Sequence, residues 1–147
     1  MTAKQPEVRI ELPDPQTATG EARELFDTIM RSRGQNYVAN LFRAFGNSPQ
    51  ALERAAAVGE HVRYHTAIDD TLREILILTV AQEVGSAYEW THHYHIAERL
   101  GVDKTTLSQI GTVELEERLG EQGDVVRYVR CVAKNEQVDD ATFASVL

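Results

Sequence analysis

Two glutamates and one histidine have the residue types and the spacing of a proton-transfer site. Glu89 and His93 are four residues apart, so they share one face if the segment is helical. A carboxylate beside an imidazole orients the ring, and the ring can donate or accept a proton near neutral pH. Glu74 directly precedes the apolar run Ile75–Ala81. If a buried helix turns Glu74 toward the other two, the three groups share a proton in a dry site, which indicates general acid–base chemistry.

The same residues also have a purely structural interpretation. Ser86 and Glu89 form the pattern of a capping box, in which the serine oxygen accepts from the glutamate amide at a helix start. Thr71 and Glu74 have the same spacing. A single histidine such as His93 is commonly a satisfied polar residue on a helix. Ser86 therefore has two interpretations, a cap or a substrate-binding hydroxyl.

The remaining histidines suggest a metal site only weakly. His61 and His65 are four residues apart, and His92 and His95 are three apart, so each pair can share a helical face. Four imidazoles from two helices could form a site within a bundle, but two imidazoles without a clear third ligand make a weak signal. We predict no metal and no organic cofactor.

Two further side chains are candidates outside this cluster. Arg43 lies among apolar neighbours and could bind a substrate carboxylate, or it could be a surface arginine that covers Phe42 or Phe45. Cys131 is the only cysteine, so an intrachain disulfide is impossible. It falls within an apolar helical segment, which predicts a buried structural thiol.

The elements that position these residues are predicted to be helices. All four prolines lie at or before residue 49, and the rest of the chain shows helical periodicity closed by glycines. The run Ile75–Ala81 could be a buried strand by periodicity alone. We predict a central buried helix, because the apolar run extends from Leu72 to Val84 and no second strand is available to pair with it. Expected helices cover about 21–33, 37–45, 49–66, 69–85, 86–100, 104–110 and 123–135, with a last turn from Asp139 or Asp140.

Length and composition limit the class of protein. The 147 residues suit one domain, which we expect to cover 21–147 behind an extended arm at 1–20. A net charge of −8 disfavours nucleic acid and acidic membrane surfaces as partners. No apolar segment is long enough to span a membrane, and the N-terminus lacks the apolar core of a secretory signal. We therefore expect a soluble, cytoplasmic protein.

Several segments together resemble the carboxymuconolactone decarboxylase family of the alkylhydroperoxidase D-like superfamily. The resemblance covers about residue 37 to the end. It rests on NLFRAFGNSP at 40–49, LREILIL at 72–78, YEWTHH at 88–93, IAERLGV at 96–102 and DDATF at 139–143.

The resemblance implies an all-α fold, assembled as homo-oligomeric trimers or hexamers with the pocket near subunit contacts. Glu74 matches the superfamily's glutamate and His93 its histidine. Ser86 and Glu89 stand where the alkylhydroperoxidase D branch has two cysteines. Because serine and glutamate cannot reduce a peroxide, cysteine peroxidase chemistry is not expected, and the decarboxylase-like branch fits better.

The function we expect is a cofactor-free decarboxylase, or a related lyase or isomerase, acting on a small carboxylated lactone or ring acid. In this hypothesis His93 donates the proton, Glu89 orients the ring and Glu74 holds a proton in the same network. Ser86 and Arg43 would contact the substrate. Two alternatives stay open: a peroxiredoxin-type antioxidant enzyme, for which only Cys131 could serve, and a non-enzymatic helical oligomer that binds a small ligand.

Overall fold

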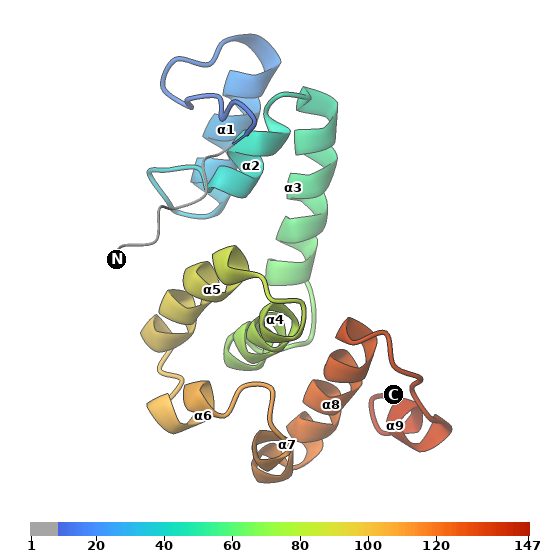
Figure 1. The fold of residues 1–147 in the computed structure, drawn as a ribbon. Coiled ribbons are helices and arrows are strands. Elements are labelled where there is room, and N and C mark those ends of the chain that lie inside the picture. The colour runs from blue at the N-terminus through green and yellow to red at the C-terminus, as the bar shows by residue number, and fades with distance from the viewer. Residues whose placement is uncertain (1–8) are drawn as a thin grey trace. The chain divides into compact units, whose positions relative to one another are not determined.

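The computed structural model describes residues 9–147, and the described chain is built of helices without strands (Figure 1). The all-α prediction is confirmed. No helix in this part of the chain is long and apolar enough to cross a membrane. The chain divides into two compact units, one up to Thr66 and one from Ala67 to Leu147. The arm at 1–20 and the single domain at 21–147 remain predictions.

The first unit contains three helices. These are α1 (Gly20–Ser32), α2 (Asn40–Phe45) and α3 (Pro49–Tyr64), and α3 packs against both of the others (Figure 1). Its core is a cluster of side chains that are almost fully withdrawn from water. The cluster consists of Phe26, Ile29, Val38, Phe42 and Leu52.

The start of α2 differs from the prediction. A helix was expected from Tyr37, but α2 begins at Asn40 and the backbone at Ala39 is extended. Val38 is buried in the core although it precedes the helix. An apolar residue in a loop that fills a core position cannot be distinguished by periodicity from the first turn of a helix.

Side chains on and after α2 form hydrogen bonds to the backbone of residues 11–13. The guanidinium of Arg43 donates to the carbonyls of Leu12 and Pro13, at 2.9 and 3.0 Å. Asn47 donates to the carbonyl of Glu11 at 2.8 Å. Three successive backbone carbonyls are therefore satisfied by side chains rather than by a regular element.

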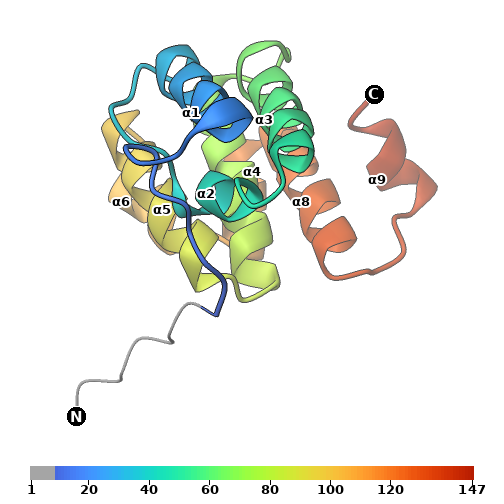
Figure 2. The ribbon, with the colours of Figure 1, turned by 90° about the horizontal axis from the view of Figure 1, so that it is seen from above.

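The second unit is arranged around α4 (Asp70–Glu83), which packs against α5 (Ala87–Arg99) and α8 (Glu121–Ala133) (Figure 2). Helix α7 (Val113–Leu119) packs on α8, and so does the short α9 (Asp140–Ala144). Helix α6 (Lys104–Ser108) follows α5. The core cluster draws on α4, α5 and α8 and on the segments between them: Leu72, Ile75, Leu76, Leu78, Ala97, Leu107, Ile110, Leu115 and Val126.

The apolar run after Glu74 is a helix and is mostly buried, as predicted. Its buried residues lie on nearly every side of α4, because the helix has neighbours on two flanks. The polar residues Arg73, Glu74 and Thr79 are buried with them. Charged groups in such a position need partners, since removing an unpaired charge from water is costly.

The region before α8 was predicted incorrectly. Helix α7 was not expected at all, and α8 begins at Glu121 rather than near Gly123. Gly123 lies inside α8, where a Cβ atom would fall 1.8 Å from the carbonyl oxygen of Glu116. The glycine therefore marks close approach of α7 and α8, not a helix start.

Candidate active site

Asp69 fixes the start of α4 and so sets the position of the glutamate that follows. Its side chain accepts hydrogen bonds from the amides of Thr71 and Leu72. The hydroxyl of Thr71 also donates to it, and these bonds lower the pKa of the Asp69 carboxyl. The capping box expected between Thr71 and Glu74 is thus wrong: the cap residue is Asp69, which leaves the Glu74 side chain for other contacts.

Glu74 and His93 make the shortest contact of the site. Glu74 is completely buried on α4, as predicted, and the side chain of His93 on α5 is 12% exposed. Oε2 of Glu74 lies 2.6 Å from Nδ1 of His93. This contact joins the two helices through a buried carboxylate and an imidazole.

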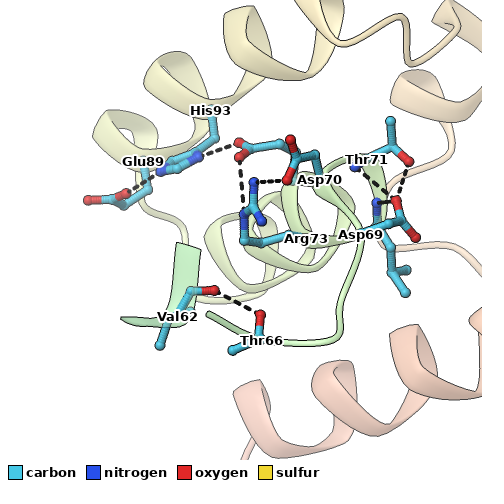
Figure 3. A network of polar contacts seen from close by, with 10 residues as sticks. Val62, Thr66, Asp69, Asp70, Thr71, Arg73, Glu89 and His93 are labelled. Atoms are coloured by element: carbon cyan, nitrogen blue, oxygen red, sulfur yellow. Dashed lines mark hydrogen bonds and ion pairs between the residues drawn. The ribbon is translucent and has the colours of Figure 1, made fainter. Parts of the chain in front are cut away.

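Glu89 lies on the other side of the same ring (Figure 3). Its Oε2 is 3.5 Å from Nε2 of His93, and its side chain is about one-third exposed. The predicted sharing of one helical face by Glu89 and His93 is confirmed. The imidazole therefore lies between a buried carboxylate at Nδ1 and a carboxylate in contact with solvent at Nε2.

Arg73 joins the cluster, and the sequence reasoning did not include it. Its Nη2 lies 2.8 Å from Oδ1 of Asp70, and its Nε lies 3.9 Å from Oε1 of Glu74 (Figure 3). Arg73 is nearly buried, whereas the Asp70 side chain is 65% exposed. A signal was available: an arginine directly before Glu74 at the edge of an apolar run has to be paired if the run is buried.

The arrangement can hold and deliver a proton at a defined nitrogen. An ionised carboxylate only accepts hydrogen bonds, so an ionised Glu74 requires the proton of the short contact to be on Nδ1 of His93. The other nitrogen, Nε2, is then the one that exchanges its proton. Two carboxylates beside one imidazole are suited to general acid–base chemistry.

Ser86 occupies a structural position at the start of α5. Its hydroxyl accepts from the amide of Glu89 at 3.4 Å, as in the first half of the expected capping box. Ser86 also lines a shallow pocket of about 270 Å³ together with Gln82 and Trp90. The pocket lies at the turn between α4 and α5, and seven residues of helix, about 10 Å, separate Ser86 from His93 along the axis.

Arg43 lies in the first unit, where it lines a different cavity. This cavity has a volume of about 360 Å³, and Arg23 and Tyr37 also line it. Besides its bonds to Leu12 and Pro13, Arg43 donates to the side chain of Asn40 at 3.2 Å. Three of the five N–H groups of Arg43 donate in these bonds, and the other two make no hydrogen bond within residues 9–147.

Of the other histidines, His92 lies beside His93, with the two ring centroids 5.2 Å apart in an edge-on arrangement. The rings of His61 and His65 are 6.0 Å apart, and the ring of His92 stacks parallel to Tyr88. Within residues 9–147, no group of three or more His, Cys, Asp or Glu side chains is placed to hold a metal ion. Cys131, expected to be buried, is half-buried on α8, because that helix is covered on only part of its surface.

A family comparison covers the region that carries these residues. Residues 49–116 match the model of the carboxymuconolactone decarboxylase family. The matched region runs from the start of α3 into α7 and includes Glu74, Ser86, Glu89 and His93. The match covers 68 of the 147 residues, and it supports membership of the carboxymuconolactone decarboxylase family, which the sequence motifs also indicate.

Proposed function

We propose that this protein is a cofactor-free lyase of the decarboxylase or isomerase type, acting on a small carboxylated lactone or ring acid. The observation that carries the proposal is the position of the His93 ring. Its Nδ1 is bound to the buried Glu74, and its Nε2 faces the part-exposed Glu89. Such a ring has one fixed nitrogen and one that can deliver a proton.

The proposed reaction needs a proton donor rather than a redox group. When an unsaturated lactone loses its carboxylate as carbon dioxide, the electron pair of the broken carbon–carbon bond passes into the ring as a dienolate. The lactone carbonyl accepts this charge, so the substrate is its own electron sink. The reaction is complete when a carbon of the dienolate gains a proton, which His93 donates from Nε2.

The three polar groups then have distinct roles. Glu74 orients the ring through Nδ1, since its contact is the short one. Glu89 stabilises the cationic form of the ring by its negative charge. It also transfers a proton from solvent to Nε2, because it is the carboxylate that contacts water. The sequence hypothesis gave the orienting role to Glu89. The two distances, 2.6 Å for Glu74 and 3.5 Å for Glu89, favour Glu74 for this role instead.

Two residues are proposed to bind ligand groups, each within its own unit. Ser86 presents its hydroxyl to the part of the ligand that enters the pocket beside Trp90. Arg43 binds a carboxylate in the cavity of the first unit, where its two remaining N–H groups provide a fork for such a group.

We also propose a homo-oligomer. Val80, Val84 and Tyr88 are large apolar side chains that the second unit leaves exposed on α4, the following turn and α5. Apolar groups that gather on one surface favour association with another chain. Sedimentation at micromolar concentration should give a mass above 16.5 kDa, and a mass equal to that of one chain would count against association.

The function is tested by a substrate screen. Carboxylated lactones and ring acids are incubated with the protein, and carbon dioxide release and substrate loss are followed by proton NMR. Turnover that disappears in His93→Gln is the expected result. Ligand-induced melting shifts without turnover on any compound would instead favour the non-enzymatic ligand-binding alternative.

A further inference from the structure

We infer that Arg73 is a positioning residue that fixes Glu74 as a carboxylate and thereby sets the tautomer of His93. Arg73 lies in the site of the proposed function, and its role in catalysis rests on that proposal. It assigns a role to a side chain outside the glutamate–histidine pair. The physical reasons are the burial of the arginine, its two acidic neighbours and the charge balance of the cluster.

The geometry makes Arg73 a bridge between the surface and the buried carboxylate. Its Nη2 is held by Asp70 at 2.8 Å, and that aspartate faces solvent. Its Nε lies 3.9 Å from Oε1 of Glu74. The two oxygens of Glu74 therefore have different neighbours: Oε1 faces the guanidinium, and Oε2 faces the imidazole.

The charge balance explains why Glu74 can remain ionised without exposure to water. A buried carboxylate is costly unless a cation or several donors compensate it. The guanidinium of Arg73 is always charged, and it is itself buried. It places a compensating charge beside Glu74 whether or not His93 carries a second proton.

The tautomer of His93 follows from this arrangement. With Glu74 ionised, Oε2 can only accept, and a neutral His93 must carry its proton on Nδ1. The lone pair of Nε2 then points away from Glu74 and toward Glu89, whose Oε2 is 3.5 Å away. Without Arg73, Glu74 would reduce its charge by binding a proton. It could then donate to Nδ1, and the proton of the neutral ring would move to Nε2.

The test uses nitrogen-15 NMR of the histidine rings in the full-length protein, at a pH where His93 is neutral. The wild-type protein should show His93 with a protonated Nδ1 and an unprotonated Nε2. Arg73→Gln should lose this pattern and shift the proton toward Nε2. A wild-type His93 protonated on Nε2, or a folded Arg73→Gln protein that keeps the wild-type pattern, would overturn the inference.

A second variant covers the case in which Arg73→Gln does not fold. Glu74→Gln keeps the shape of the side chain but has one oxygen and one amino group. The Nε–H of Arg73 lies 3.9 Å from the Oε1 position and can only donate, so its charge should favour the amide oxygen on that side and turn the amino group toward His93. Nδ1 must then accept, and the neutral ring should switch to the Nε2–H tautomer. Retention of Nδ1–H in Glu74→Gln would contradict the role given to Arg73.

The control removes the same charge elsewhere. Arg99 is exposed in the last turn of α5, the helix that carries His93. Arg99→Gln should leave the tautomer unchanged, and a shift equal to that of Arg73→Gln would show a general charge effect and overturn the inference. The NMR result needs no substrate. If the tautomers behave as expected but no compound is turned over, the positioning role stands and the proposed function fails.

Discussion

Replacing His93 tests whether the ring acts in chemistry or in packing. His93→Gln removes the titrating group but keeps an N–H donor that can face Oε2 of Glu74. If His93 is the proton donor, turnover should fall by about 10²–10⁴-fold, the range for losing a positioned acid or base. That loss corresponds to about 3–5 kcal/mol of transition-state stabilisation.

The expected effect on stability is much smaller. The hydrogen bond at risk is the 2.6 Å contact to a fully buried carboxylate. Losing a bond to a charged group costs about 1.5–3 kcal/mol, and that loss is expected for His93→Leu. Glutamine preserves a donor, so His93→Gln should change the free energy of unfolding by less than about 1 kcal/mol. Both variants should lose turnover equally, although their stabilities differ.

A neighbouring histidine provides the control. His95 is 65% exposed on the same helix, and its Nδ1 lies 3.4 Å from Oε2 of Glu98. His95→Gln should leave turnover unchanged and alter stability by no more than about 0.5 kcal/mol. Turnover is measured on the substrate found in the screen, and stability by urea denaturation. The reasoning is refuted if His93→Gln unfolds the protein while its folded fraction is fully active.

Four further predictions concern packing at two glycines, the pH dependence of stability and the cysteine. Gly123→Ala should destabilise by more than about 3 kcal/mol, because the new Cβ meets a backbone oxygen at 1.8 Å. Gly59→Ala lies inside α3, where the new Cβ would be 3.4 Å from the end of the Arg33 side chain and 4.0 Å from the ring of Phe42, so it should stabilise by about 0.5–1 kcal/mol in a urea denaturation assay. Hydrogen bonds from Thr106 lower the pKa of Asp103, so the stability it adds is complete above the unfolded-state pKa of about 3.9 and is lost as the pH falls through the lower folded-state value. The free energy of unfolding should therefore fall less between pH 6 and 2.5 in Asp103→Asn than in the wild-type protein. An equal dependence on pH in the two proteins would contradict this. Cys131→Ser should keep full turnover, and a loss would revive thiol chemistry.

The sequence was sufficient to predict the buried helix and the residues it brings together. An apolar run without turn residues required burial on several sides, and Glu74 at its edge had to be buried with it. The spacing of Glu89 and His93 required a shared face. Neither pattern contains the rotation of α4 against α5, so the choice of Nδ1 for Glu74 and Nε2 for Glu89 could not be predicted.

The errors have a common physical origin in tertiary contacts. Helix α7 has charged residues at most positions, and its helical state depends on packing against α8. Gly123 was interpreted as punctuation, whereas its missing side chain permits close approach of two helices. Arg73 was overlooked because a charge before a glutamate is usually solvated, and only burial of both groups gives it a role.

The most direct test of the proton-donor claim is the stereochemistry of proton delivery. The decarboxylation is run in deuterium oxide, and the configuration of the newly protonated carbon is determined by NMR after chiral derivatisation. A donor held on one side of the dienolate predicts a single deuterium on one face in the wild-type product, and loss of that preference in the residual turnover of His93→Gln. Wild-type product labelled equally on both faces would mean that free solvent supplies the proton, and it would contradict the role of His93.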